Sequence, residues 1–369
     1  MIIVLQAVAI VCAVVSSLFF VLVYSGWMRA LRTPPARREP RPVSVIIAAH
    51  NEAAVLPRLL AALNEQDYPR DLFEIILVDD RSDDGTSDIA QGMGSDLPIR
   101  ILRIDETPDG VSPKKWALHQ GIAVARNDLL LLTDADCLPR PAWIRSMTAA
   151  FSDDVETVIG LAPLTAGDDG ASRFAAFESR RTMALSISAA AFGIPYMASG
   201  RSWGFTRTMY ERCGGLPTLY AHLGGDDDLL LQRMLKHGAS VGVCTRQDAM
   251  VLSAAPTGWK DLLRQKLRHY RVSSAYRGRG ASFLAAFVLS ETLTPLAVVA
   301  LTVLMPGPER VLPLLMWLWK LWYDTGFLAY AFRWMEGDNA RIRLAFSEGF
   351  HIFFSALTGV TSYVKPPRW

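Results

Sequence analysis

The side chains best suited to chemistry in this 369-residue chain are paired aspartates that follow apolar runs. Asp134 and Asp136 come just after four consecutive leucines. Two carboxylates at this spacing repel one another unless a cation lies between them. Oxygen ligands favour Mg²⁺ or Mn²⁺ over zinc, and such an ion would neutralise charge on a diphosphate leaving group. The pair predicts a divalent-metal site, with an ordinary acidic loop as the alternative.

A second acidic pair, Asp79 and Asp80, could present a carboxylate to a nucleobase N–H or a ribose hydroxyl. An EF-hand loop starting at Asp80 is excluded, because Ser82 takes its third position and Gln91 takes its twelfth, where a bidentate glutamate belongs. A turn with a helix cap explains residues 82–86 but not the acidic pair before them. Nucleotide binding is therefore the functional interpretation of this cluster.

A third acidic cluster, Asp226, Asp227 and Asp228, begins a helical pattern. The helix dipole stabilises carboxylates in a first turn, so capping is the structural interpretation. Three in succession exceed what a cap requires, and one could remove a proton from an acceptor hydroxyl. Balancing positive charge is available at Lys114 and in residues 264–271, which could contact a diphosphate, anionic lipid or both.

Short apolar runs alternate with helical patterns through the middle of the chain. This alternation predicts an α/β domain with a mostly parallel sheet, and runs that are nearly all apolar fit strands buried on both faces. Ligands bind at the carboxyl ends of such strands, where the acidic pairs fall. The predicted strands are 43–49, 74–78, 99–104 and 129–132, and the predicted helices are 53–65, 85–93, 114–125 and 141–151.

The composition indicates contact with lipid. Hydrophobic residues make up 51% of the chain and charged residues 20%, which is more apolar than an ordinary soluble enzyme. The net charge of +2 says little about partners, and no nucleic-acid partner is expected. The cysteines lack the spacing of a metal site and are interpreted as reduced thiols: Cys12, Cys137, Cys213 and Cys244.

An uncharged stretch from Ile2 to Tyr24 is long enough to cross a bilayer at about 1.5 Å per residue. A cleaved signal peptide is the alternative, but the basic leader and the small-residue cleavage site are missing. Basic residues follow the stretch instead, which predicts an external N-terminus and a cytoplasmic domain at the cell (inner) membrane. These residues are Arg29, Arg32, Arg37, Arg38 and Arg41.

Further apolar stretches lie near the C-terminus, at 282–304, 311–331 and 344–364. Glu291 and Pro295 interrupt the first candidate span. Lys320 and Asp324 in the second are four residues apart on one helix face, so we expect them to pair. The third stretch could span the membrane or lie along the interface.

The chain resembles glycosyltransferase family 2, the inverting enzymes of GT-A fold, which have membrane-embedded members. The resemblance covers residues 43 to about 271, with Pro113 where the family usually has glycine. It implies a Rossmann-like, mostly parallel catalytic domain that takes a sugar from a nucleotide-sugar donor with Mg²⁺ or Mn²⁺. The matching motifs are VSVIIAAHNE at 43–52, VDDRSDDGT at 78–86, KKWAL at 114–118, TDADC at 133–137 and SGRSWGFTR at 199–207.

The resemblance also assigns roles to individual residues. Asp80 would contact the base, Lys114 would lie near the phosphates, and Asp136 would be the chief metal ligand. Asp134 would contact the ribose or share the metal. The full set implied for donor binding is Glu52, Asp79, Asp80, Lys114, Asp134, Gln265 and Arg268.

Two further motifs bear on the identity of the catalytic base and on whether the enzyme is processive. The family's base is followed by an arginine six residues later, so counting back from Arg233 gives Asp227 as the base and puts Asp226 in the position of the family's glutamate. QKLRH at 265–269 resembles the Q-x-x-R-W signature of processive members, but His269 replaces the tryptophan. This difference argues against a polysaccharide synthase and favours one or a few transfers to a lipid or glycan acceptor.

Other classes of protein stay open as alternatives. A nicotinamide dehydrogenase is disfavoured, because no G-x-G-x-x-G follows the first strand. Pyrophosphate release would identify a nucleotidyltransferase of similar fold, and donor hydrolysis would exclude a non-catalytic scaffold. The expected organisation is a membrane helix at 1–28, a catalytic domain at 42–257, a basic interfacial segment at 258–280 and two or three transmembrane or interfacial helices within 281–369.

Overall fold

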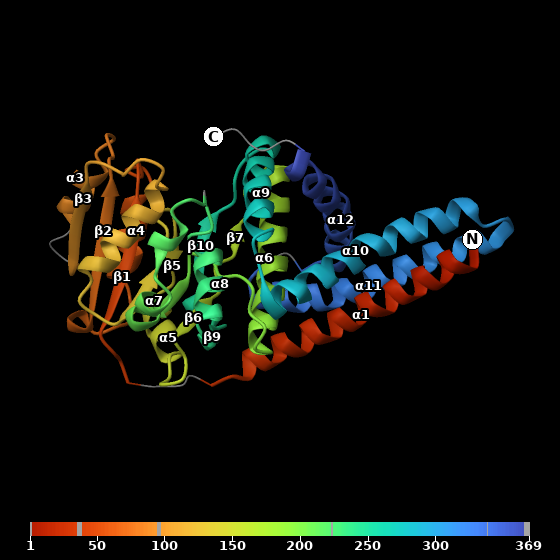
Figure 1. Cartoon of the computed structure of the whole chain (residues 1–369), viewed down its shortest axis with the longest axis horizontal. Helices are drawn as coiled ribbons and strands as arrows, with labels where there is room; N and C mark the ends of the chain where they lie inside the picture. The colour runs from red at the N-terminus through yellow and green to blue at the C-terminus, as the bar shows by residue number, and fades with distance from the viewer. Residues whose placement is uncertain (1, 35–38, 94–96, 223, 338, 365–369) are drawn as a thin grey trace.

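The computed structural model describes residues 2–34, 39–93, 97–222, 224–337 and 339–364, so Arg37 and Arg38 lie outside the described residues. A body that contains the β-sheets is joined to a bundle of long helices, which projects from one side (Figure 1). The body carries the three acidic clusters, and the bundle is formed by apolar segments from near the two ends of the chain.

A seven-stranded sheet lies at the centre of the body, in the order β3-β2-β1-β4-β8-β6-β9. Neighbouring strands are parallel except at β8, which is antiparallel to both β4 and β6. The predicted α/β architecture with a mostly parallel sheet is confirmed. The strands are β1 Val43–Ala49, β2 Phe73–Asp80, β3 Ile99–Ile104, β4 Leu129–Leu132, β6 Thr157–Gly160, β8 Trp203–Thr206 and β9 Val241–Cys244.

The strands predicted from the sequence form one half of this sheet. β1, β3 and β4 have the predicted bounds, and β2 continues through Asp79 and Asp80, because its pairing with β3 extends to Asp80. Successive side chains of a strand point to opposite faces, and Val45, Ile46 and Ile47 are all fully buried, so both faces are covered. The predicted helices are also present, as α2 Leu56–Asn64, α3 Thr86–Met93, α4 Pro113–Val124 and α5 Trp143–Ala149.

A second, three-stranded sheet has the order β5-β10-β7. It consists of β5 Leu138–Pro139, β10 Val251–Ala254 and β7 Leu164–Thr165. Two long helices, α6 Gly170–Ala191 and α9 Trp259–Ser273, run across the base of the helical bundle (Figure 1). The shorter helices α7 Arg207–Arg212 and α8 Asp228–Lys236 complete the body.

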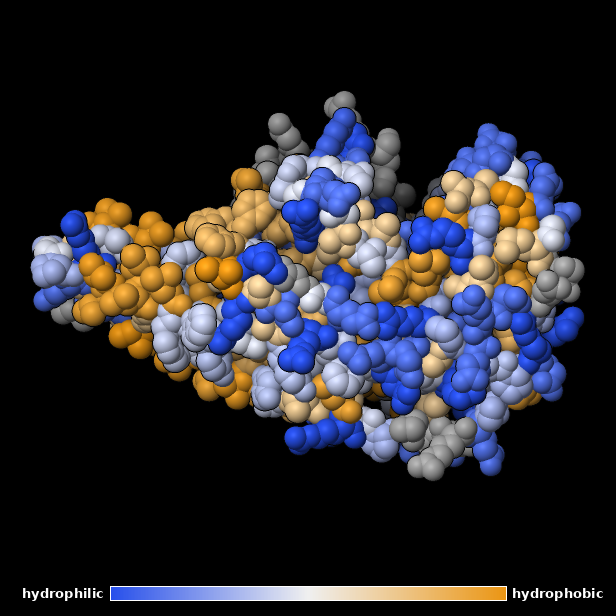
Figure 2. Space-filling model, turned by 180° about the vertical axis from the view of Figure 1, so that it is seen from behind, coloured by the Kyte–Doolittle hydropathy of each residue, from blue (hydrophilic) through white to orange (hydrophobic). Residues whose placement is uncertain are grey.

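The terminal segments form the helices α1 Ile2–Arg32, α10 Gly278–Leu304, α11 Val311–Trp334 and α12 Arg341–Val364. Two described segments are long and apolar enough to cross a membrane, Gln6–Arg32 of α1 and all of α10. α10 continues through Glu291 and Pro295, so the expected interruption does not occur. Apolar residues cover the projecting bundle, whereas hydrophilic residues cover much of the body (Figure 2). The membrane placement of α11 and α12 stays a prediction.

The bundle buries charged side chains that pair between helices. Lys320 and Asp324 of α11 bond to each other, as predicted. Lys320 Nζ also lies 2.9 Å from Glu291 Oε1 of α10, and Ser16 Oγ of α1 donates to the same oxygen. Burying an unpaired charge costs several kcal/mol, so these contacts favour one packing of α1, α10 and α11 over others.

A buried ion pair joins α6 to α12. Arg181 donates to both carboxylate oxygens of Glu348, with Nε–Oε2 and Nη2–Oε1 distances of 2.8 Å. The side chains are 6% and 0% exposed. Replacing Glu348 with glutamine would remove the carboxylate that bonds to the buried Arg181 and leave Glu291 at the longer distance of 3.7 Å. We expect the free energy of unfolding to fall by about 3–5 kcal/mol, measured by thermal or denaturant unfolding in detergent.

The control for this prediction is Glu336→Gln. Glu336 is exposed and pairs with Arg140, so losing its charge is expected to cost less than about 1 kcal/mol. Equal destabilisation by the two substitutions would contradict a special contribution from the buried pair.

Candidate functional site

The acidic clusters meet at one edge of the central sheet. β2, β1 and β4 are adjacent and parallel, so Asp80, Glu52 and Asp134 lie at or just beyond the same ends of neighbouring strands. Burial raises the pKa of Glu52, and the negative charges of Asp136 and Asp134 raise it further. Glu52 is therefore in electrostatic contact with the predicted metal pair.

Two tight turns after β1 and β2 are bonded to each other. Asn51 and Arg81 have φ values of 57° and 58°, in a left-handed region that is unfavourable for residues with a side chain. The Asn51 N–H donates to Ser82 Oγ, and the Asp83 N–H donates to Asn51 Oδ1, both at 3.0 Å. These bonds stabilise the strained turns that hold Glu52 and the second acidic cluster.

Asp79 and Asp80 have different surroundings despite being adjacent. The fully buried Asp79 carboxylate accepts hydrogen bonds from the Ser82 N–H at 3.0 Å and from the Ser87 hydroxyl. These contacts support the turn. The Asp80 carboxylate is held by Arg81, with Nε 2.8 Å from Oδ1, so a nucleobase would compete with Arg81 for it. Contact of either aspartate with a nucleoside stays a prediction.

The predicted metal pair lies in the loop between β4 and β5. Asp134, Asp136 and Cys137 each offer a ligand atom, and these atoms lie within 4.8 Å of one another. Burial raises the pKa of the Cys137 thiol, and both aspartates raise it further, so the thiol stays protonated and is a poor cation ligand at neutral pH. Ser253 Oγ of β10 donates to Asp136 Oδ2 at 3.0 Å and orients that carboxylate.

Lys114 connects the metal pair to the third acidic cluster. Its Nζ lies 2.7 Å from Asp134 Oδ1 and 3.3 Å from Asp226 Oδ2. Burial lowers the pKa of Lys114, but the two carboxylates outweigh this effect and hold it well above its usual value. The pocket between the clusters is lined by Lys114, Leu118, Leu132, Thr133, Asp134, Gly200, Asp226 and Asp227.

Asp226 and Asp227 are neighbours with opposed pKa shifts. Burial and the charge of Asp226 raise the pKa of Asp227, whose carboxylate accepts hydrogen bonds from the Gly200 N–H at 2.9 Å and the Asp228 N–H at 2.7 Å. Burial acts on Asp226 in the same direction, but Lys114 lowers its pKa overall. In such an arrangement one carboxylate stays ionised while the other can accept a proton.

The remaining predicted residues lie on α9. The aliphatic part of Arg268 passes over Gly224, where an added Cβ would be 3.8 Å from Arg268 Cγ. Arg268 is therefore beside the loop that holds the third acidic cluster. Gln265 lies almost one turn earlier on the same helix. Lys266 Nζ is 2.9 Å from Glu178 Oε2, which fixes α9 against α6.

Three supporting contacts were not predicted from the sequence, those of Ser253, Tyr276 and Lys115. The Tyr276 hydroxyl donates to Asp228 Oδ2 at 2.6 Å, and nothing in its local sequence indicates this contact. The buried Lys115 donates to the carbonyl oxygens of Leu219, at 2.9 Å, and His222. Successive side chains of a helix point about 100° apart. This geometry could have indicated that Lys115 does not share the position of Lys114 between the acidic clusters.

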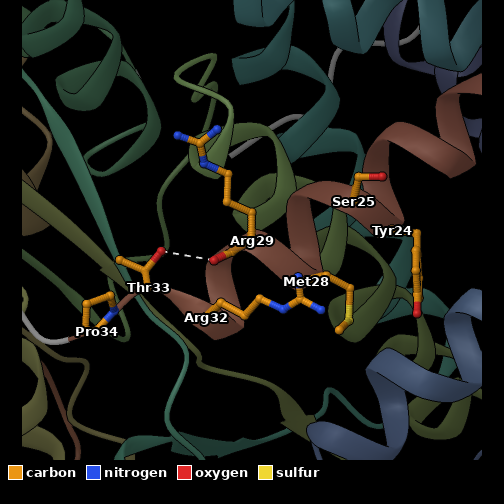
Figure 3. A pocket seen from close by; sticks show the side chains of 7 residues that line it. All are labelled: Tyr24, Ser25, Met28, Arg29, Arg32, Thr33 and Pro34. Carbon is orange, nitrogen blue, oxygen red and sulfur yellow. Dashed lines mark hydrogen bonds between the residues drawn. The ribbon is translucent and has the colours of Figure 1, made fainter.

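Another pocket lies at the C-terminal end of α1 (Figure 3). Thr33 Oγ1 donates to the Arg29 carbonyl oxygen at 3.0 Å where the helix ends. The lining offers positive charge but no carboxylate, so it lacks the carboxylate base and the carboxylate metal ligands of the acidic pocket. Its residues are Tyr24, Ser25, Met28, Arg29, Arg32, Thr33 and Pro34. The acidic pocket is therefore the candidate catalytic centre.

Curated relatives match about a third of this chain. Probable glycosyltransferase YdaM of Bacillus subtilis is 33% identical over 112 residues, which is 30% of this chain and 27% of that protein. Glycosyltransferase AglE of Haloferax volcanii is 31% identical over 118 residues, which is 32% of this chain and 38% of that protein. The matched region is less than half of either relative.

A solved structure matches nearly the whole chain. Mannosyltransferase PcManGT from Pyrobaculum calidifontis, determined in complex with GDP-Man and Mn²⁺, has 20% sequence identity and a TM-score of 0.62. The match covers 95% of this chain and 99% of that one. At this level of identity the likeness concerns the fold, and it agrees with the GT-A fold expected from the motifs.

The family model described as "Glycosyltransferase like family 2" matches residues 40–271. This range is more than half of the chain and contains all three acidic clusters, β1 to β10 and most of α9. The ordered motifs found in the sequence fall within the same range. The chain belongs to the glycosyltransferase like family 2.

Proposed function

We propose that this protein is an inverting glycosyltransferase, which moves a sugar from a nucleoside-diphosphate sugar to a hydroxyl of a lipid or lipid-linked acceptor. The observation that carries the proposal is the single pocket shared by Lys114, Asp134, Asp226 and Asp227, which come from three distant segments. Positive charge for a leaving diphosphate and a carboxylate for the acceptor proton are the two requirements of this reaction.

A divalent cation fits the residues present. The Asp134 and Asp136 carboxylates supply the oxygen donors that Mg²⁺ or Mn²⁺ prefers. When bound, the ion would stabilise negative charge on the diphosphate. Lys114 and Arg268 would add positive charge there. The nucleoside would be held by the residues at the ends of the first strands, Glu52, Asp79 and Asp80, with Gln265 contributing from α9.

Asp227 is the proposed general base. It would take the proton of the acceptor hydroxyl as that oxygen bonds to the anomeric carbon and the bond from this carbon to the diphosphate breaks. Attack opposite the leaving group inverts the anomeric carbon. The Gly200 N–H orients the Asp227 carboxylate, and Asp226 stays ionised beside Lys114.

The raised pKa of Asp227 predicts the pH profile of the reaction. A base acts in its deprotonated form, so activity is lost as the pH falls through the raised pKa. We expect the acidic limb of kcat/KM against pH to lie above the usual aspartate value of about 3.9. Initial rates in buffers of constant ionic strength would measure the limb. A limb at or below the usual value would contradict the assignment.

The proposed location is the cell membrane, with the catalytic domain on the cytoplasmic side. The apolar helices α1 and α10 would span the bilayer. Arg29 and Arg32 in the last turn of α1, and Arg41 after it, support this orientation. A lipid acceptor is supported by α9, which lies across the base of the bundle and carries Arg268 (Figure 1). An acceptor anchored in the membrane could then reach Asp227 without leaving the bilayer.

The test is to incubate membranes that contain the protein with a panel of labelled nucleotide sugars and to partition the products between organic solvent and water. We expect one donor to give a labelled organic-phase product, and membranes with the Asp136→Ala variant to give none. A product found only in water would exclude a lipid acceptor. Absence of both transfer and donor hydrolysis for every donor would refute the activity, and release of pyrophosphate would indicate a nucleotidyltransferase.

A further inference from the structure

The last helix, α12, has one face that is apolar and exposed. Ile342, Phe346, Phe350, Phe353 and Leu357 recur at intervals of three or four residues and so share one side of the helix. Ile342 is 70% exposed, Phe346 76%, Phe353 57% and Leu357 67%. Large apolar side chains in such a continuous stripe are unfavourable in water and mark a surface that something covers.

The opposite face of α12 is fixed to the body by charged contacts. Glu348 pairs with Arg181, and His351 Nδ1 lies 3.0 Å from Glu178 Oε1. At the start of the helix, the Arg341 guanidinium stacks on the Trp322 ring of α11, 3.9 Å from its centroid. The helix therefore cannot turn its apolar stripe inward without breaking buried ion pairs.

The orientation of α12 differs from that of the candidate spans. It runs obliquely across the base of the bundle, whereas α1, α10 and α11 extend together along the projection (Figure 1). It is also outside the two described segments that are long and apolar enough to cross a membrane.

The stripe adjoins other exposed apolar surface. Trp259, at the start of α9, is 47% exposed and contacts Phe350, with ring centroids 5.6 Å apart. The candidate spans also carry exposed apolar side chains, including Leu289, Leu296 and Val303 of α10, and α12 is joined to them through its contact with α11. This arrangement favours acyl chains and headgroups of the same bilayer as the occupant, because one lipid surface could cover the spans and the stripe together.

We propose that α12 is an in-plane membrane anchor, whose stripe of Ile342, Phe346, Phe350, Phe353 and Leu357 sits at the boundary between headgroups and acyl chains. The inference rests on the proposed insertion of α1 and α10. An amphipathic helix of this kind buries its apolar face about 5–10 Å into the interface. The contact between Phe350 and Trp259 then sets the depth at which α9, and with it Arg268, meets the membrane.

The test measures the membrane depth of single positions in the full chain. Nitroxide labels are attached to cysteines introduced one at a time at Ile342, Phe346, Phe353 and Leu357, in a Cys12→Ser background. The other native cysteines, Cys137, Cys213 and Cys244, are buried. Proteoliposomes of phosphatidylcholine and phosphatidylglycerol are used, and depth is obtained from the relative accessibility of each label to oxygen and to a water-soluble nickel chelate. Retained thermal stability confirms that each labelled variant is folded.

The control series is Leu289, Leu296 and Val303 of α10, whose outermost positions are 14 residues apart, compared with 15 for the α12 series. In a helix along the bilayer normal, the depth would change by about 21–23 Å between the outermost labels at 1.5 Å per residue. We expect that change in depth along α10. The α12 labels, in contrast, are expected at the interface, at depths within about 10 Å of one another.

The possible outcomes separate the two proposals. A gradient in α10 with an equal gradient in α12 would mean that α12 spans the membrane. A gradient in α10 with nickel-accessible, oxygen-poor labels on α12 would mean that water or a soluble partner covers the stripe. Either result overturns the in-plane anchor and leaves the proposed membrane location intact. Water-exposed labels in both series would refute that location, and the anchor with it.

Discussion

Replacing Asp227 with asparagine is expected to lower the rate of sugar transfer by about 10³-fold, the typical contribution of a positioned general base. The amide has nearly the same shape as the carboxylate but cannot take the acceptor proton. Donor affinity is expected to change little, because the cation pair and Lys114 are unaltered. Initial rates at saturating donor give the first quantity, and calorimetric titration with the intact donor gives the second.

The matched control is the same substitution one residue later. Burial raises the pKa of Asp228 well above its usual value, and its carboxyl group is bonded to the Ala198 N–H and the Tyr276 hydroxyl rather than lining the pocket. Asp228→Asn should therefore retain most of the transfer rate. If Asp227→Asn were as active as Asp228→Asn, the base would have to be sought elsewhere in the pocket.

Replacing Asp136 with alanine is expected to weaken Mn²⁺-dependent donor binding by at least about 100-fold, since it removes one of the two carboxylates available to the cation. The remaining carboxylate, Asp134, would keep its bond to Lys114 at 2.7 Å and would have little charge left for an ion. Donor titrations of both proteins in Mn²⁺ and in EDTA measure the effect. The natural protein should lose affinity in EDTA, whereas the variant should bind equally weakly in both.

Two further substitutions test this prediction, one with an expected intermediate effect and one with no expected effect. Ser253→Ala keeps the ligand but removes the hydroxyl that orients it, so we expect an intermediate loss of about tenfold. Asp154→Ala removes an exposed carboxylate outside the pocket and should have no effect. Undiminished affinity of the Asp136→Ala variant in Mn²⁺ would remove Asp136 from the metal site.

Local sequence patterns predicted the elements that support the pocket. Strands such as Leu129–Leu132 are runs of apolar residues ended by polar ones, so both their positions and the aspartates that follow them can be read directly. The bond between Lys320 and Asp324 was also predictable, because helix geometry alone brings residues four apart together. The structure adds that the carboxylate of Asp79, predicted beside the nucleoside, also accepts hydrogen bonds from the turn that follows β2.

Contacts between distant segments could not be predicted in this way. Ser253 and Asp136 are 117 residues apart, and their contact depends on how the small sheet packs against the β4 loop. The antiparallel β8 lies within the motif SGRSWGFTR at 199–207, but that motif does not indicate its antiparallel pairing with β4 and β6. Glu291 likewise pairs with Lys320 only because α10 packs beside α11. Such partners are set by topology, which no local pattern encodes.

The short connection between β10 and α9 limits where the chain length can change among related sequences. Ser253, near the end of β10, orients Asp136, and residues 255–258 lead directly into the helix that carries Arg268. Gly258 has a φ of 80°, and its N–H lies 3.4 Å from Asp169 Oδ1. An insertion or deletion here would have to displace either the serine or the arginine. Length changes among related sequences should therefore avoid residues 255–258 and fall in open loops such as 105–112.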